Sequence, residues 1–181
     1  MLDPRMPPPE ECVIRYVLDR HAEAQPDKTF VIFDDGEEWS YAHLRRTVRG
    51  CADGLRRLGV AQGDFVLVWL PNGKDCLRVM LALNYLGAVY VPINTGYRGG
   101  LMEHVIDNAG ARLMIAAAPL VERLAGADTA ELHDVVVLGG EADPVPGLEL
   151  LPAGVLEGDP DALPEPERPI RPWDTFSIIY T

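Results

Sequence analysis

The residues best placed for chemistry form a short polar loop near the middle of the chain. Residues 95–100 read Thr-Gly-Tyr-Arg-Gly-Gly and combine a hydroxyl, a phenol and a guanidinium with flexible glycines. They follow a short apolar segment that Pro92 ends, because proline cannot donate to a sheet ladder. Ligands of open α/β sheets sit at the carboxyl ends of strands. The pattern is that of a binding loop carrying Gly96, Tyr97 and Arg98, or of an ordinary strand-to-helix connection.

Pairs of carboxylates are the other candidate reactive groups. Asp34 with Asp35, and Glu37 with Glu38, are adjacent in sequence. Adjacent side chains on a strand point to opposite faces, so these pairs make poor acid–base partners, and we interpret them as turn and edge charges. The three cysteines and four histidines lack metal-ligand spacing. No G-x-G-x-x-G, G-x-S-x-G or G-x-x-x-x-G-K-[ST] motif occurs, so the motifs define no complete catalytic site.

The composition is that of an acidic chain with a sizeable core. With 181 residues, 48% of them hydrophobic, the chain can form one domain. Its net charge of −12 repels phosphate backbones, so we expect no nucleic-acid partner and interpret an arginine-rich helix at 45–57 as a solvated face. The longest apolar stretch, 79–93, is too short and too interrupted to span a bilayer. The amino terminus lacks a signal-peptide core, and we expect a cytoplasmic protein.

Strand and helix signals alternate along the chain with short connections. Ser40 has the side chain of a helix N-cap, and Gly87 that of a left-handed helix stop. Residues 65–70 form a continuous apolar run, typical of a strand buried on both faces. The expected helices are 12–24, 41–58, 74–86, 100–108 and 119–125, and the expected strands are 29–33, 37–40, 65–70, 88–91, 112–116 and 135–138. The order predicts an α/β fold: a doubly wound, mostly parallel sheet flanked by helices, with an N-terminal β-hairpin.

We divide the chain into four parts. Residues 1–11 are a Pro-rich tail, 12–138 are the α/β subdomain, and 139–173 are a Pro-rich acidic excursion over the surface. Residues 174–181 begin as a buried strand at which the sequence stops. Because a compact domain rarely ends inside a strand, we expect a fragment of a longer protein.

Three blocks of the sequence resemble the adenylate-forming (AMP-binding) superfamily, which comprises acyl-CoA synthetases, luciferases and peptide-synthetase adenylation domains. Residues 39–44 read Trp-Ser-Tyr-Ala-His-Leu, and 83–94 read Leu-Asn-Tyr-Leu-Gly-Ala-Val-Tyr-Val-Pro-Ile-Asn. Residues 178–181, Ile-Ile-Tyr-Thr, resemble the lead-in to the family's Ser/Gly/Thr-rich phosphate loop. The resemblance covers nearly all of 12–181, and 94–99 are most similar to acid–CoA ligases, especially the carnitine/crotonobetaine-CoA ligase-like members.

The resemblance implies the N-terminal subdomain of an enzyme that uses ATP, Mg²⁺ and coenzyme A. A carboxylic acid would react with ATP to give an acyl-adenylate and pyrophosphate, and coenzyme A would then displace AMP. By this resemblance Tyr180 and Thr181 lie at the edge of the ATP-phosphate loop. Gly96, Tyr97 and Arg98 are candidates for coenzyme A binding, with Arg98 facing a phosphate or simply solvating its loop. The family's magnesium-binding Glu and mobile Lys match no residue here, so we assign no catalytic or metal residue.

Two hypotheses of different class follow. In the first, the chain is an amino-terminal fragment of a ligase, inactive alone, whose exposed apolar surface can drive homo-oligomerisation. In the second, it is a stand-alone, non-catalytic α/β domain for binding or scaffolding. The identity of the acyl substrate is not encoded in these residues.

Overall fold

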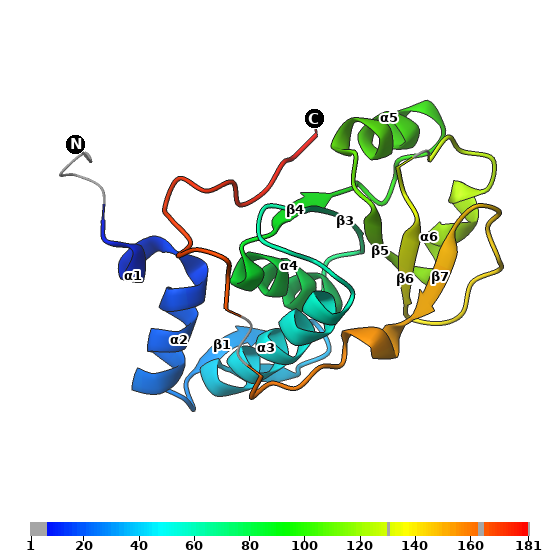
Figure 1. The fold of residues 1–181 in the computed structure, drawn as a ribbon. Helices are drawn as coiled ribbons and strands as arrows, with labels where there is room; N and C mark the ends of the chain where they lie inside the picture. Colours follow the sequence, from blue (N-terminus) through cyan, green and yellow to red (C-terminus); the bar gives the residue numbers. More distant parts are fainter. Residues whose placement is uncertain (1–6, 130, 163–164, 181) are drawn as a thin grey trace.

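A five-stranded parallel sheet forms the centre of the molecule (Figure 1). The computed structural model describes residues 7–129, 131–162 and 165–180. Among them the strand order is β4-β3-β5-β6-β7, and every neighbouring pair is parallel. The strands are β3 (Phe65–Trp69), β4 (Val89–Pro92), β5 (Leu113–Ala117), β6 (Asp134–Leu138) and β7 (Glu149–Pro152). Because β4 and β5 lie on opposite sides of β3, the winding direction reverses there, and the predicted doubly wound sheet is confirmed.

Helices cover both faces of this sheet. The helices α3 (Tyr41–Arg57) and α4 (Lys74–Leu86) pack on one face, against Val66 and Val68 of β3. The other face, with Leu67 and Trp69, packs against α5 (Gly100–Ala109), α6 (Ala118–Val121) and the 3₁₀ turn η1 (Glu122–Leu124). Both sets of strand side chains are buried, which explains why the sequence of β3 is apolar without alternation.

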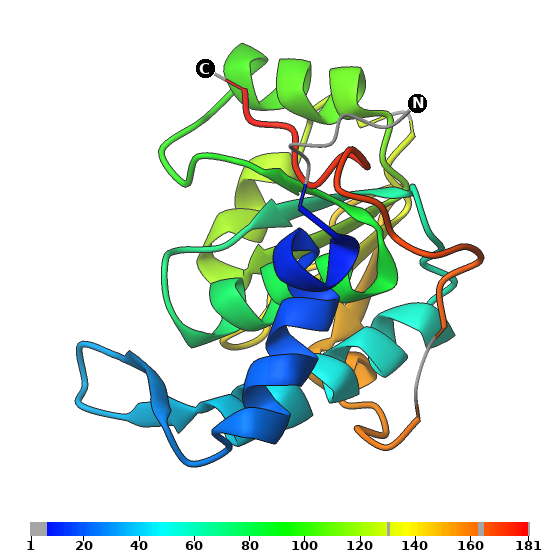
Figure 2. The same ribbon diagram turned by 90° about the vertical axis from the view of Figure 1, so that its left-hand side faces the viewer.

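The amino-terminal elements pack beside α3 and α4 (Figure 2). They are α1 (Pro9–Cys12), α2 (Ile14–Ala24) and an antiparallel hairpin of β1 (Thr29–Ile32) and β2 (Glu38–Ser40). Arg15 of α2 is buried, with its guanidinium 4.4 Å from the ring centroid of Tyr85 and Nη1 donating to the Tyr85 carbonyl at 3.1 Å. This buried cation ties α2 to α4.

Two predicted helix boundaries are confirmed by their capping geometry. The Ser40 hydroxyl accepts a 3.2 Å hydrogen bond from the His43 amide at the start of α3. Gly87 ends α4 with a φ of 76°, a left-handed conformation that favours glycine. Each cap is a local signal, which is why both could be read from the sequence.

The Pro-rich segment 139–173 differs from the predicted surface excursion because part of it belongs to the core sheet. β7 pairs with β6 along its whole length, and the 3₁₀ turn η2 (Ala153–Leu156) follows at once. Leu156 is fully buried against the α3 side of the core. Pro152 lies at the end of this edge strand, where its missing N–H breaks no interior ladder.

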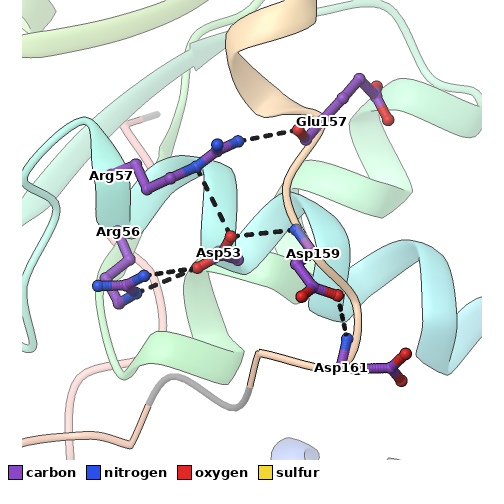
Figure 3. Close-up of polar contacts among 6 residues, drawn as sticks. All are labelled: Asp53, Arg56, Arg57, Glu157, Asp159 and Asp161. Atoms are coloured by element: carbon purple, nitrogen blue, oxygen red, sulfur yellow. Dashed lines mark hydrogen bonds and ion pairs between the residues drawn. The ribbon is translucent and has the colours of Figure 1, made fainter.

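Downstream of η2, residues 157–161 cross α3 at very short range (Figure 3). The side chain of Asp53 is only 5% exposed, and its Oδ2 accepts a 3.0 Å hydrogen bond from the Asp159 amide. Arg56 donates through Nε and Nη2 to Asp53 Oδ1 at 3.2 and 2.7 Å, and these bonds hold the pKa of the Asp53 carboxyl below its ordinary value. Arg57 donates to the Glu157 carbonyl at 2.8 Å. These two arginines of α3 are therefore structural, and not merely part of a solvated face.

The expected buried strand at the end of the chain is wrong within the described residues. Segment 174–180 makes one isolated parallel bridge, between Ser177 and Tyr90, beside the edge strand β4. The Tyr90 amide donates to the Phe176 carbonyl at 3.2 Å, and the Ile178 amide donates to the Tyr90 carbonyl at 3.1 Å. Phe176 and Ile179 are exposed. The segment occupies the place of a sixth strand without forming a ladder.

None of the helices in the described part of the chain has the length and apolar character that crossing a bilayer requires.

Candidate functional site

The predicted binding loop follows β4 at the carboxyl edge of the sheet and is ordered by its own hydrogen bonds. The carbonyl of Asn94 accepts from Trp69 Nε1 at 3.1 Å and from the Tyr97 amide at 2.9 Å. The side-chain oxygen of Asn94 accepts from the Gly96 amide at 2.8 Å. Gly99, with a φ of 53°, then turns the chain into α5. The backbone of the loop is therefore held in a defined conformation.

The three predicted residues of this loop differ in exposure. Gly96 and Arg98 are exposed, whereas Tyr97 is half-buried against the apolar cluster beneath α5. The Arg98 guanidinium forms no ion pair with the residues that the structure describes. An exposed guanidinium on an ordered loop is suited to a phosphate or carboxylate, which it can bind with two parallel hydrogen bonds.

Arg123 is a second cation of this loop that the sequence did not indicate. Its Nη1 donates to the Thr95 carbonyl at 2.6 Å, and its guanidinium lies 5.7 Å from the ring centroid of Trp69. Its Nε is buried and has no hydrogen-bond partner among the described residues. Arg123 comes from η1, on the far side of β5, and no local motif links it to the loop. It both braces the loop and places positive charge beside it.

The second predicted site, at the end of the chain, lies against α5. The Tyr180 hydroxyl accepts a 2.9 Å hydrogen bond from Asn108 Nδ2, and the Tyr180 ring meets the His104 ring edge-on with centroids 6.3 Å apart. Figure 2 shows the segment that carries Tyr180 ending beside this helix. Thr181 lies outside the described residues. Tyr180 thus packs against α5, and the candidate loop lies just before the same helix. The structure does not join the two into one site.

The acidic hairpin turn lies over an open hollow of about 340 Å³ at the carboxyl ends of β3, β5 and β6. The Lys74 ammonium forms ion pairs with Asp35 and Glu37, and Glu37 also accepts from Trp39 Nε1 at 2.6 Å. Hydrogen bonding to Asp35 and then Glu37 raises the pKa of Lys74, and the bond from Lys74 lowers the pKa of each carboxyl. The carboxylates are engaged with a cation and are not poised for acid–base chemistry.

The described residues contain no group of three or more His, Cys, Asp or Glu arranged for a metal ion. Cys51 is buried, and burial raises the pKa of its thiol to about 12, so it is inert as a nucleophile. Within the described part of the chain, the geometry supports anion binding at the 94–99 loop and no complete catalytic centre.

The fold agrees with the sequence family. Residues 18–181 match the family described as AMP-binding enzyme, and the chain belongs to this family. Over 169 residues it is 34% identical to 3-[(3aS,4S,7aS)-7a-methyl-1,5-dioxo-octahydro-1H-inden-4-yl]propanoyl:CoA ligase of Mycobacterium tuberculosis, a match that covers 91% of this chain and 33% of the relative. Over 184 residues it is 33% identical to acetyl-coenzyme A synthetase of Chromobacterium violaceum, with 91% of this chain and 28% of the relative covered.

Solved structures show the same fold. A long-chain-fatty-acid-CoA ligase from Archaeoglobus fulgidus superposes with a TM-score of 0.78 at 23% identity, covering 100% of this chain and 35% of that one. A fatty acyl CoA synthetase from Mycobacterium tuberculosis gives a TM-score of 0.76 at 24% identity, covering 96% and 33%. The chain therefore spans about a third of the length of the relatives that it matches.

Proposed function

We propose that this chain is the amino-terminal part of an ATP-dependent acid–CoA ligase. The observation that carries the proposal is the family match over 18–181, together with relatives named as CoA ligases and synthetases that align with 91% of the chain. The carboxylate of an acid substrate would attack the α-phosphate of ATP to give an acyl-adenylate with release of pyrophosphate. The acyl group would then pass to the thiol of coenzyme A with release of AMP.

In this proposal the 94–99 loop binds coenzyme A. Arg98 supplies an exposed guanidinium for a phosphate, and Gly96 lets the backbone approach the ligand closely. Tyr97 anchors the loop on the core, and Arg123 holds its Thr95 carbonyl. Two cations near one ordered loop favour this role for Arg98 over simple solvation of the loop.

Tyr180 and Thr181 would lie at the edge of the ATP-phosphate site. The Tyr180 hydroxyl accepts a hydrogen bond from Asn108, which holds the Tyr180 side chain against α5. ATP would bring Mg²⁺ as its counter-ion, and the described residues contain no cluster of three or more His, Cys, Asp or Glu side chains arranged for a metal ion. We propose that residues 1–181 are inactive alone.

Pyrophosphate exchange tests the proposal. The longer protein that contains these residues should exchange labelled pyrophosphate into ATP with at least one acid from a panel of carboxylates, and residues 1–181 alone should not. Exchange by 1–181 alone would overturn the claim of inactivity. Absence of exchange in the longer protein with every acid would overturn the ligase assignment.

Coenzyme A binding is tested separately in the second half-reaction. Arg98→Ala should raise the KM for coenzyme A about tenfold and leave pyrophosphate exchange unchanged, as expected for loss of a charge-assisted contact. Arg46→Ala, which removes an exposed arginine of α3, is the matched control. An unchanged KM for coenzyme A in Arg98→Ala would remove this residue from the site.

One observation favours the alternative of a stand-alone binding or scaffolding domain: both faces of the sheet are already covered by helices of this chain. That alternative requires a monodisperse product that unfolds cooperatively and exchanges no pyrophosphate. The exposed apolar side chains of Trp173, Phe176 and Ile179 instead favour association with itself or with further polypeptide. We also propose a cytoplasmic location, which three unpaired cysteines support.

A further inference from the structure

We propose that Asn84 and Asn108 are positioning residues that fix segment 174–180 from two opposite sides. The inference rests on the proposed function, because only in a ligase does this segment carry the edge of the ATP-phosphate site. The two asparagines come from α4 and α5, which cover opposite faces of the sheet. Segment 174–180 passes between these helices along the free edge of β4.

Asn84 is a buried polar residue whose side-chain amide donates a hydrogen bond to this segment. It is only 6% exposed, and its Nδ2 donates a 3.2 Å hydrogen bond to the carbonyl of Phe176. The same carbonyl accepts the amide of Tyr90 at 3.2 Å. Phe176 is thereby held by both the edge strand and the helix behind it.

The placement of Asn84 is costly for stability. Its Oδ1 is buried and has no hydrogen-bond partner among the described residues. A leucine at this position would leave no unsatisfied acceptor inside the core. The benefit of asparagine lies in its donor, and the Phe176 carbonyl is the group that receives it.

Asn108 holds the other end of the segment. Its Nδ2 donates to the Tyr180 hydroxyl at 2.9 Å, while the Tyr180 ring rests against His104, one turn earlier on α5. Between the two anchors only the Ile178 amide reaches β4, at the Tyr90 carbonyl. A single backbone bridge leaves an edge segment free to slip, so the side-chain amides set its register.

Amide hydrogen exchange of residues 1–181 tests the positioning directly. Asn84→Leu should accelerate exchange of the Tyr90 and Ile178 amides at least tenfold and leave Val68, in the sheet interior, within twofold. Asn72→Ala, in the exposed loop before α4, is the control and should change none of them. Unchanged exchange at both Tyr90 and Ile178 would overturn the role of Asn84.

The Asn108 anchor is tested on the surface, where a substitution does not endanger folding. Asn108→Ala and Tyr180→Phe each remove one partner of the same bond, so each should accelerate exchange of Ile178 and the double variant should add little further. Additive effects of the two substitutions would show that the bond does not act as a unit and would overturn the anchor.

The link to ATP is tested by pyrophosphate exchange in the longer protein. Asn84→Leu and Asn108→Ala should each raise the KM for ATP in this assay at least fivefold. The KM for coenzyme A, measured in thioester formation, should stay constant, and partial unfolding would not produce such a split. Faster amide exchange with an unchanged KM for ATP would overturn the link to the phosphate site. If even the unsubstituted protein exchanges no pyrophosphate, the proposed function fails, and the amide-exchange results still decide the anchoring.

Discussion

The Gly158 amide donates a 3.1 Å hydrogen bond to the Gly50 carbonyl, where two segments distant in sequence touch backbone to backbone. A β-carbon on Gly158 would lie 2.5 Å from both the Gly50 oxygen and the Gly54 nitrogen. A β-carbon on Gly54 would lie 2.7 Å from the backbone of Leu156. No side chain fits at either position, so glycine is required there by contact.

Gly158→Ala should therefore destabilise the fold by about 2 kcal/mol, the cost of overpacking a tight contact. Gly54→Ala should also destabilise the fold. In a helix interior this substitution usually stabilises, because alanine is the better helix former, so the opposite effect in α3 would be due to the contact with Leu156. Urea unfolding measures both. Gly154→Ala, in η2 with open space around it, is the control and should be near neutral. Equal stabilities of all three variants would refute the close crossing.

Asp53→Asn should lower the free energy of unfolding by about 1 kcal/mol at pH 7, because the half-exposed Arg56 guanidinium and the Asp159 amide lose their charged acceptor. Hydrogen bonding from Arg56 lowers the pKa of the folded-state carboxyl. The ionised Asp53 carboxylate therefore stabilises the folded state fully above pH 3.9, which is about the pKa of this group in the unfolded chain. The stabilisation is lost as the pH falls through the lower pKa that the group has in the folded state. In urea titrations, the difference in free energy of unfolding between the unsubstituted protein and Asp53→Asn should become smaller from pH 5 to pH 2. A gap that is constant with pH would contradict the ionised state of Asp53.

Arg123→Ala should loosen the 94–99 loop without unfolding the domain. Loss of one hydrogen bond, to the Thr95 carbonyl, corresponds to about a fivefold change in local opening. Trypsin cleavage after Arg98, followed by mass spectrometry, should accelerate by that factor. Arg46→Ala controls for a general change in susceptibility, and equal rates in the two variants would show that Arg123 does not brace the loop.

Lys74→Met should release the hairpin turn from the start of α4, because Lys74 pairs with Asp35 and Glu37 of that turn. Amide exchange at Phe33, whose N–H donates to the Glu37 carbonyl, should rise about threefold in low salt. Because the ion pairs of Lys74 are exposed, 0.5 M NaCl should remove most of the difference. Lys28→Met removes the other lysine of the chain and should leave Phe33 unaffected. A difference that persists in high salt would point to apolar packing of the Lys74 stem on Phe33 instead.

Elements with strong local signals were predictable from the sequence. The apolar run of β3, the Ser40 cap and the Gly87 stop each depend on residues within one helical turn or one strand. The hairpin was predictable for the same reason, from its Asp-Asp-Gly turn. The alternation of strand and helix signals predicted the doubly wound, mostly parallel sheet, and the structure confirms it.

Features that depend on contacts between distant segments were not predictable. β7 is a four-residue strand within a Pro-rich segment, and only its pairing with β6 makes it a strand. Segment 174–180 has the composition of a strand, yet the short edge strand β4 offers it a single bridge. Arg123 reaches the candidate loop from η1, on the same face of the sheet but 28 residues after Thr95, so spacing in sequence gave no sign of it. The roles of Gly96, Tyr97, Arg98, Tyr180 and Thr181 stay predictions.

The path of residues 156–178 bears on how the chain folds during synthesis. Leu156 fills the core beside α3, residues 157–161 close over the glycines of that helix, and Phe176 completes a contact with Asn84. Until these residues have left the ribosome, part of the apolar surface of α3 and α4 stays uncovered. A nascent chain shorter than about 160 residues should therefore leave this layer incompletely packed, and residues 156–178 should complete its folding rather than begin it.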